Sequence, residues 1–558
     1  MHPEKPSGLS TLMDKNDKLG LAIVSVFTII FSIASSILSY MKYISFHDTV
    51  FDLGVSSDLI KNATSNSIEY QKLIYFLMFP VYHFFPSQIG LMVFQDAFIC
   101  AGSIPLYFIS RKIIENRRYS VIISILWLMY FPLTGVQWFD FHFMALFPTL
   151  FLIGFAFFVY GRYKESLVFM YLAGITDLLA PVILIFFIII LVIKKSKVPK
   201  YYLYTILIPI ITVMVSVIII EPTYITGFIN FHSLSANPGI LYSSLNRKIL
   251  YFVLAGIPLA LISFIVPEII LIIPYMGLVF AHNYIPYFQP VSYQYPALIA
   301  SGMFISFIYG LKRIESKKFK VQIKHVMPVI IAITIITWLL FTPYGNLITD
   351  NNSGIPYANE ISMGNYEAYS SITCTVEDKE LNSMIVKIPE GSSVAIQNNM
   401  PQLVQSYHFV LPFNNYNGSP EYIVTDPYST WFYDIAISPG SYTNTVSLAN
   451  EKLSSGNYGI LYEESGMILM EKGYTGKARQ FIPYEVTSMN NSIINFMPPG
   501  NYSVHLNVNI TLIDNNKIYN ITSVNGMGTL ILKNYITHVI IVSRSNQIIT
   551  FTQENYIF

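Results

Sequence analysis

The sequence predicts a polytopic α-helical membrane protein with a soluble region at its C-terminal end. Hydrophobic residues make up 53% of the 558 residues and charged residues only 12%, about half of the roughly 25% charge that soluble domains carry. Apolar runs long enough to cross a bilayer recur up to about Tyr344. Beyond that residue the chain is rich in Asn, Ser, Tyr and Gly and contains no such run. A net charge of +1 gives no indication of a nucleic-acid partner.

The change in composition divides the chain into a membrane domain, residues 1–343, and a soluble region, residues 344–558. The first apolar run, residues 19–41, is too long for a signal-peptide core and lacks a small-residue cleavage site. We therefore expect it to be retained as the first span. Cys100 lies in an apolar run and Cys374 in the polar region, so no disulfide framework is expected.

Clusters of Lys and Arg set the predicted orientation, because these residues concentrate on the cytoplasmic side of a membrane. The clusters lie in "RKIIENRRYS", "GRYKES", "KKSKVPK" and "LKRIESKKFKVQIK". With these segments inside, the expected spans are residues 19–41, 88–110, 121–137, 142–160, 201–220, 249–266, 268–279, 292–310 and 325–342. This orientation places the N-terminus in the cytoplasm and residues 344–558 outside, on the far side of a plasma membrane.

Residues 167–193 break this alternation, because basic segments flank the apolar run at both ends. The run is too short to cross a bilayer twice at about 20 residues per crossing. A hairpin of two short helices that turns near "GITDLLAP" resolves the conflict, and Gly174 and Pro181 favour a break there. The predicted total is then about 11 membrane helices.

Asn-x-Ser/Thr sequences offer a partial check, because glycosylation requires an outer segment. They begin at Asn62, Asn351, Asn417, Asn490, Asn501, Asn509 and Asn520. All fall on predicted outer segments. An Asn-rich tail contains several by chance, so they agree with the orientation without proving it.

With this orientation the ionisable residues of the membrane domain collect near its outer face. They are His47, Asp48, Asp52, Asp58, Asp140, His142, Glu221, His232 and His282. Asp96 lies about two turns below the outer edge of its span, and Asp177 lies at the turn of the hairpin. An ionisable group costs about 2.5 kcal/mol or more at the centre of a membrane helix, so such groups are candidates for a functional site. The cluster predicts an aqueous cavity that opens to the outside.

The soluble region is expected to hold a mixed α/β domain, residues 344–473, followed by a β-sandwich, residues 474–558. Strands are predicted at "SSVAIQ", "EYIVTD" and "YGILYEESGMILMEKG", and a helix at "MPQLVQSYHF". "SVHLNVNITLI" alternates strictly and predicts one strand, and "HVIIVSRSNQIITF" predicts a hairpin that turns at residues 543–546. The sandwich is a candidate for binding an acceptor, a surface glycan or a cell-surface partner.

Several sequences in a fixed order resemble one known family. They are "FDLG" after the first span, "GSIPLYFISRK", "FDFHFMALFP", the acid in "GITDLLAP", and "SYQYPALIA". The order resembles the prokaryotic predicted membrane proteins called domain of unknown function 2079, over roughly residues 40–470. Asp177 stands where a glutamate is more usual, and Ser56 and Ser57 where a Phe–Gln-like pair is more usual. The family in turn is similar to the GT-C glycosyltransferases, which use polyprenyl-phosphate-linked sugars on the outer membrane face.

The GT-C resemblance implies an inverting sugar transfer in which a carboxylate of the first outer loop deprotonates the acceptor hydroxyl. Asp52 in "FDLG" is the matching position. Asp48 lies four residues earlier, on the same face if the stretch is helical, and two neighbouring carboxylates leave one ionised as the base. The alternative is that these acids cap a loop and face solvent, which is the expectation for Asp58.

The departing phosphate needs positive charge. Arg247 and Lys248 lie on the predicted outer side, against the positive-inside tendency, and are candidates for holding the lipid head; interfacial snorkelling is the alternative. Asp140, His142 and His282 are candidates for contacts to the sugar or the donor. No cofactor is identified, although Asp140 and His142 are compatible with a divalent metal, which the reaction does not require.

The embedded acids leave two roles open: Asp96 and Asp177 either contact the donor or are buried structural groups. Two other functions also stay open. A transporter or flippase of a lipid-linked precursor needs polar groups along a path from one side to the other, whereas the predicted acids stop at the outer half. A non-catalytic surface anchor leaves the buried acids unexplained. The sequence contains no P-loop, GxSxG, HExxH or CxxC motif that would indicate hydrolase or nucleotide chemistry.

Overall fold

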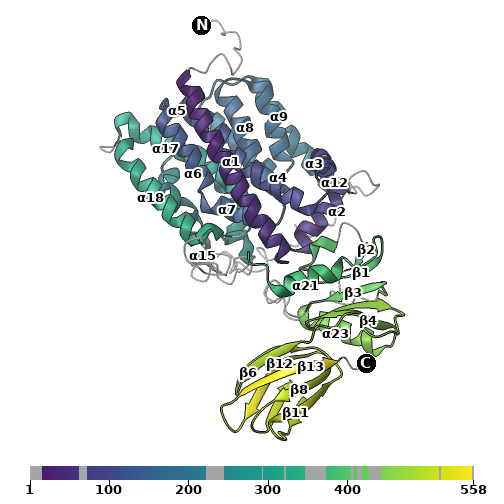
Figure 1. Ribbon diagram of the computed structural model, residues 1–558. Coiled ribbons are helices and arrows are strands. Elements are labelled where there is room, and N and C mark those ends of the chain that lie inside the picture. Colours follow the sequence, from purple (N-terminus) through teal and green to yellow (C-terminus); the bar gives the residue numbers. More distant parts are fainter. Residues whose placement is uncertain are drawn as a thin grey trace. The chain divides into compact units, whose positions relative to one another are not determined.

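The computed structural model describes residues 15–61, 72–220, 244–291, 293–318, 322–345, 372–403, 408–410, 418–426, 441–514 and 517–555. The chain divides into two compact units: the first comprises Met1–Tyr43 and Val55–Ile372, and the second comprises Ile44–Gly54 and Thr373–Phe558. The first unit is helical and the second contains the β-sheets (Figure 1). The segment Ile44–Gly54, which follows the first helix directly, therefore belongs by its packing to the C-terminal unit.

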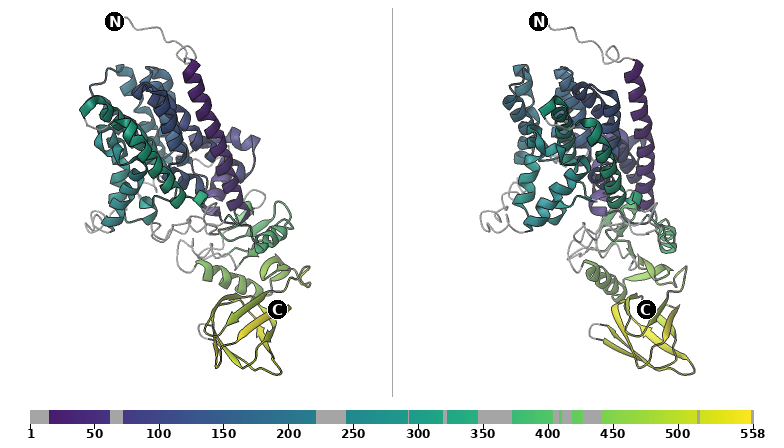
Figure 2. Two further views of the ribbon diagram at one scale, coloured as in Figure 1. Left: turned by 60° about the vertical axis from the view of Figure 1, so that its left-hand side comes forward. Right: turned by 90° about the vertical axis from the view of Figure 1, so that its left-hand side faces the viewer.

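The first unit is built from helices of very different length. They are α1 (Lys15–Ile44), α2 (Val55–Lys61), α3 (Lys72–Phe84), α4 (Gln88–Ala101), α5 (Ser103–Ile114), α6 (Arg117–Leu128), α7 (Phe131–Trp138), α8 (Phe147–Val159), α9 (Tyr163–Gly174), α10 (Ala180–Ile193), α11 (Lys200–Thr205), α12 (Ile208–Ile220), α15 (Leu245–Gly256), α16 (Ile273–Ala281), α17 (Ala297–Arg313) and α18 (Ile323–Phe341). Short 3-10 turns join some of them, among them η7 (Pro267–Ile272), η8 (Ile285–Phe288) and η10 (Pro343–Gly345). α1 runs the length of this unit along one side (Figure 2).

Four helical stretches of the described residues are long and apolar enough to cross a membrane: Asp17–Ile44, Gln88–Ile114, Ala297–Ser316 and Ile323–Phe341. α6 and α7, bent by 40° at the break between them, count as a fifth if taken together. Shorter apolar helices cover Phe143–Val159, Ala180–Ile193, Lys200–Val215 and Pro267–Ala281. The prediction of a helical N-terminal part with several spans is confirmed. The total of about 11 stays a prediction.

Local sequence explains where the helices begin and break. The Ser87 side chain caps α4 by accepting the Gly90 N–H at 3.1 Å. α9 ends at Gly174 and α10 begins at Ala180 with Pro181 in its first turn, so the predicted break near "GITDLLAP" is present. The predicted span 249–266 is not one helix: α15 stops at Gly256, because Pro258 follows and Ala260 and Leu261 are left-handed.

The helix α3 (Lys72–Phe84) was not predicted. α3 is apolar but only 13 residues long and contains Pro80. A search for runs of about 20 residues therefore passes over it.

Three basic side chains near the ends of helices in the first unit have polar partners. Arg111 Nε at the end of α5 lies 2.7 Å from Asp17 Oδ1. Lys194 after α10 forms an ion pair with Glu268 in η7. Arg313 at the end of α17 donates to the Ile265 carbonyl at 2.6 Å. Arg111, Lys194 and Arg313 belong to basic segments that the orientation argument places on one side, and that orientation stays a prediction.

The second unit begins with a mixed five-stranded sheet of order β2-β1-β3-β5-β4. Its strands are β1 (Ser393–Ala395), β2 (His408–Val410), β3 (Tyr422–Thr425), β4 (Tyr458–Glu464) and β5 (Met467–Lys472), and the helices are α21 (Val376–Ile385) and α23 (Ser441–Ser454). β1 runs parallel to β2 and β3, whereas β5 is antiparallel to β3 and β4. The helix predicted in "MPQLVQSYHF" is wrong: this stretch contains a 3-10 turn, Pro401–Leu403, and strand β2.

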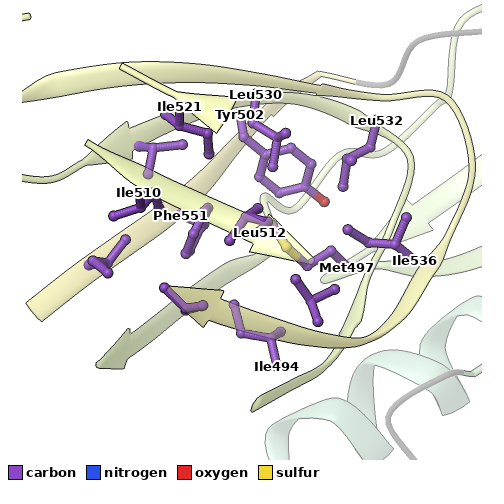
Figure 3. Close-up of a cluster of buried hydrophobic side chains, with 14 of the residues drawn as sticks. Ile494, Met497, Tyr502, Ile510, Leu512, Ile521, Leu530, Leu532, Ile536 and Phe551 are labelled. Carbon is purple, nitrogen blue, oxygen red and sulfur yellow. The ribbon is translucent and has the colours of Figure 1, made fainter. Parts of the chain in front are cut away.

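The last part of the chain is a β-sandwich of two four-stranded antiparallel sheets, β10-β9-β12-β7 and β11-β8-β13-β6. The strands are β6 (Glu485–Met489), β7 (Ile493–Met497), β8 (Gly500–His505), β9 (Ile510–Asp514), β10 (Lys517–Ile521), β11 (Met527–Leu532), β12 (Ile536–Ser543) and β13 (Ile548–Asn555). Figure 3 shows their inward side chains, among them Tyr502, Leu512 and Phe551, packed into one apolar core.

Two strand predictions in this part are wrong in the same way. "SVHLNVNITLI" is not one strand, because β8 ends at His505, β9 begins at Ile510, and Val508 between them is 37% exposed. β12 and β13 do not pair with each other, because they belong to different sheets. In both places the chain crosses from one sheet to the other. The alternation continues through the crossing, so the apolar pattern alone does not reveal it.

Candidate functional site

Lys42, in the last turn of α1, is fully buried. Its Nζ lies 2.9 Å from Asp140 Oδ1 and donates to the Trp138 carbonyl at 3.0 Å. The ammonium also lies 5.8 Å from the centroid of the Trp138 ring. Both charged side chains are fully buried. Asp140, predicted to contact a sugar or a metal, is therefore held in a buried ion pair.

Asp96 belongs to the same polar cluster. Its Oδ2 accepts a hydrogen bond from Ser39 Oγ at 2.8 Å, and Lys42 lies within electrostatic reach of its carboxylate. Its Oδ1 is buried without a hydrogen-bond partner among the described residues. A cavity of about 10 Å³ lies nearby, lined by Ser35, Leu38, Ser39, Thr134, Gln137, Trp138, Pro343 and Tyr344. This volume holds about one water molecule and has no room for a donor sugar. Asp96 is therefore better explained as a buried structural group than as a residue that contacts the donor.

His142 connects this cluster to Asp177. The backbone N–H of His142 donates to Gln95 Oε1 at 2.9 Å, and its Nδ1 lies 3.3 Å from the Asp140 carbonyl oxygen. The imidazole interacts electrostatically with Asp177. Asp177 is half-buried between α9 and α10, where its Oδ1 accepts the Leu179 N–H at 2.8 Å. The hairpin turn therefore holds a carboxylate within electrostatic reach of an imidazole.

Aromatic rings continue the site from His142 to His282. The Phe139 ring centroid lies 5.2 Å from the imidazole of His142 and 5.3 Å from the ring of Tyr293. Tyr287 then packs edge-on against Tyr295 at 4.7 Å and against His282 at 5.3 Å. Tyr287 also interacts electrostatically with Asp177. Acids, imidazoles and aromatic faces of this kind are suited to the hydroxyls and apolar faces of a sugar.

The predicted phosphate-binding pair is split by the helix. Lys248 is buried, with Nζ 3.5 Å from the Phe280 carbonyl oxygen and 5.9 Å from the Phe288 ring centroid, and it interacts electrostatically with His282. Arg247 is exposed. Neighbouring residues on α15 point about 100° apart, so only one of the two can face the interior.

The structure thus brings six predicted site residues of the first unit into one chain of interactions: Asp96, Asp140, His142, Asp177, His282 and Lys248. Sequence reasoning missed Lys42, Tyr287 and Tyr293. A signal for Lys42 was present, because it ends the first span on the predicted outer side, against the positive-inside tendency. Glu221, His232, Asn62, Asn351 and Asn417 lie outside the described residues.

Asp48 and Asp52 lie in the segment that packs with the second unit. Phe46 and Val50 are buried in the core of its α/β part, with Leu381 of α21 and Leu469 of β5. The Val50 N–H donates to the Asn398 carbonyl at 2.7 Å. The "FDLG" segment is therefore a fixed part of a folded domain.

The two acids differ in exposure: Asp48 is fully buried and Asp52 is half-buried, in the π-helical turn Val50–Gly54. Thr49 Oγ1 donates to Asp52 Oδ2 at 3.3 Å and accepts the Asp52 N–H at 3.1 Å. This arrangement is compatible with both roles considered for Asp52, a cap of the turn and a catalytic base. Asp58, expected on the surface, is half-buried in the first turn of α2.

A polar cavity of about 470 Å³ lies in the second unit. It is lined by Ser45, His47, Thr375, Glu377, Asp378, Asp426, Ser465, Pro483, Tyr484 and Glu485. Asp378 belongs to a capping box in which its Oδ2 accepts the Thr375 N–H at 2.7 Å, and burial raises the pKa of the Asp378 carboxyl. Among the described residues no group of three or more His, Cys, Asp or Glu side chains could hold a metal ion. The lining is instead suited to a polyhydroxylated ligand.

The model of the predicted membrane protein family DUF2079 matches residues 70–469. The chain belongs to this family. The match confirms the family resemblance and leaves "FDLG", residues 51–54, outside the matched range. A search of the curated proteins finds no match to this DUF2079 protein. Among solved structures, the mycobacterial arabinofuranosyltransferase AftD matches with 9% sequence identity and a TM-score of 0.37, over 95% of this chain and 58% of AftD. This DUF2079 protein thus spans 58% of the length of that enzyme.

Proposed function

We propose that this DUF2079 protein is an integral-membrane glycosyltransferase that moves a sugar from a polyprenyl-phosphate-linked donor to an acceptor on the outer membrane face. In this proposal the N-terminus is cytoplasmic and the second unit lies outside. The observation that carries the proposal is the placement of Ile44–Gly54. The carboxylates of Asp48 and Asp52 sit in a segment anchored in the core of the second unit, and Ser45 and His47 of that segment line its large polar cavity.

The proposed roles follow from the requirements of an inverting sugar transfer and are given residue by residue. The acceptor oxygen attacks the anomeric carbon, the bond to the lipid phosphate breaks, and Asp52 takes the acceptor proton. The leaving phosphate carries the negative charge, which the buried ammonium of Lys248 can stabilise. His142, Asp177, His282 and the aromatic rings beside them are proposed to hold the donor sugar. Asp140 and Asp96 are proposed to position these groups through Lys42.

Substitution of the proposed base gives the direct test. Purified full-length Asp52→Asn, incubated with a panel of polyprenyl-phosphate hexoses and pentoses and a membrane extract that supplies the acceptor, is expected to release polyprenyl phosphate at least about 100-fold more slowly than wild type. The matched control is Asp58→Asn, an acid six residues further on that has no role in the proposal and is expected to keep wild-type activity. Full activity of a folded Asp52→Asn protein would refute the assignment of the base.

The same preparation separates transfer from transport. Reconstituted protein that moves the intact lipid-linked sugar across a vesicle membrane, without releasing polyprenyl phosphate, would establish a flippase.

A further inference from the structure

A seam of polar side chains runs along the buried face of α1. They follow one another at intervals of seven, four and three residues, which places them on the same face of the helix: Thr28, Ser35, Ser39 and Lys42. Thr28 Oγ1 lies 2.6 Å from Ser103 Oγ of α5. Ser35 Oγ lies 2.7 Å from the hydroxyl of Tyr344 in η10, and Ser39 donates to Asp96 of α4 at 2.8 Å. Side-chain hydrogen bonds of this kind hold membrane helices together.

Thr134 of α7 lines the same cavity as Ser35 and Ser39, yet its hydroxyl is unpaired. The residue is only 4% exposed, and its Oγ1 has no hydrogen-bond partner among the described residues. A buried hydroxyl without a partner is destabilising, because it loses the hydrogen bonds that water would give it. Thr134 therefore calls for a partner that the described side chains do not supply.

The cavity can hold that partner. Its volume of about 10 Å³ is the smallest that accommodates one water molecule. Its polar lining comes from three segments that are distant in the sequence: Ser35 and Ser39 of α1, Thr134 and Gln137 of α7, and Tyr344 of η10. A buried water needs two to four polar partners, and these side chains provide enough of them.

We propose that one ordered water occupies this cavity, where it bonds to Thr134 Oγ1 and joins α7 to α1 and η10. A hydroxyl oxygen has one hydrogen to donate and two acceptor sites. Ser39 Oγ gives its hydrogen to Asp96 and can still accept one from the water. The hydroxyls of Ser35 and Tyr344 share a single hydrogen bond and also keep acceptor sites. The water can thus accept from Thr134 and donate to two of these oxygens.

The surroundings favour water over a metal cation. Of the described residues that line the cavity, none carries a carboxylate. The ammonium of Lys42 lies close by, because it donates to the carbonyl of Trp138, which is itself a lining residue. A second positive charge there would be repelled in a poorly solvated environment. The proposal depends on this local geometry and not on the proposed enzymatic activity.

The sign of one stability change tests the proposal. Thr134→Val keeps the shape of the side chain and removes its hydroxyl. If the water is present, the variant loses a hydrogen bond, and the equilibrium constant for unfolding of the full-length protein in SDS is expected to rise about fivefold. If Thr134 has no water, the same change removes an unpaired hydroxyl. An unfolding constant that is unchanged or lower in Thr134→Val would overturn the proposal.

Two buried hydroxyls of the first unit provide matched controls. Ser306 of α17 is fully buried, its Oγ has no hydrogen-bond partner among the described residues, and it does not line the cavity. Ser306→Ala is expected not to raise the unfolding constant. Thr334 Oγ1 of α18 donates to the Pro258 carbonyl at 2.7 Å, so Thr334→Val is expected to raise it about as much as Thr134→Val does. Equal responses of Thr134→Val and Ser306→Ala would contradict a water at Thr134.

Direct observation is the second measurement. A high-resolution cryo-electron-microscopy map of the full-length protein is expected to show one isolated peak within hydrogen-bonding distance of Thr134 Oγ1 and of Ser39 Oγ or the Tyr344 hydroxyl. A map that resolves other buried waters and shows no such peak would overturn the proposal. So would a stability that changes when K⁺ replaces Na⁺ at constant ionic strength and Thr134→Val abolishes that change, because this result would identify a metal cation in the cavity.

Discussion

The buried Lys42–Asp140 pair provides the sharpest prediction about the first unit. Replacing Lys42 by Met leaves the carboxylate of Asp140 buried without its ammonium, and Asp140→Asn leaves the ammonium buried without its carboxylate. Breaking a fully buried pair in this way costs about 3–5 kcal/mol. Replacing both partners together, in Lys42→Met/Asp140→Leu, removes both charges and is expected to cost far less than the sum of the single changes.

The free energy of unfolding can be measured by titrating the full-length protein with SDS in mixed micelles and following tryptophan fluorescence. Arg162→Met is the control, because Arg162 forms an ion pair with Glu165 in which both side chains are partly exposed, at 31% and 41%. Its loss is expected to cost less than about 1 kcal/mol. Single changes at Lys42 and Asp140 that cost no more than this control, or a double change that costs their full sum, would show that the burial argument is wrong.

Two further predictions concern the second unit. A membrane-impermeant maleimide added to intact cells should label Cys374 and spare the buried Cys100. Burial and the Asp378 carboxylate raise the pKa of the Cys374 thiol above its ordinary 9.0, so the rate of labelling should still climb above pH 9. For the same reason, Asp378→Asn should increase the rate of labelling at pH 8. No labelling until the cells are lysed would reverse the proposed orientation. Glu463 is buried and its carboxylate accepts two backbone N–H groups at 2.6 and 3.1 Å, so Glu463→Gln should lower the free energy of unfolding by about 1.5–3 kcal/mol in urea titrations followed by circular dichroism. The exposed Glu554→Gln serves as the control, and equal values for the two variants would contradict a structural role for the Glu463 carboxylate.

Hydropathy predicted the helical part well where one helix crosses in one piece, as in α1, α17 and α18. It failed where Pro258 ends α15 early, and where α3 is shorter than a search for full spans can detect. In the sandwich the sequence located β8, β9, β12 and β13 but not β6, β7, β10 or β11, and the pairing of β12 with β13 was wrong. The period of two that marks a strand carries no information about which neighbour it pairs with.

For the candidate site, too, the sequence predicted the approximate position of residues but not their contacts. The sequence placed Asp140, His142, Asp177 and His282 near one end of the helices, because each lies close to the end of an apolar run. It did not show that Lys42 neutralises Asp140, or that Lys248 turns inward while Arg247 turns outward.

By itself, then, the sequence determined that this protein has a membrane-spanning helical part and a β-rich C-terminal part. Both properties follow from local composition: an apolar run must bury its surface and satisfy its own backbone hydrogen bonds wherever it lies. Tertiary structure alone decided that Lys42 meets Asp140 across 98 residues of chain, that Phe46 and Val50 pack into the second unit, and that β12 and β13 belong to different sheets. These pairings depend on strand register and helix packing between distant segments, which no local pattern encodes.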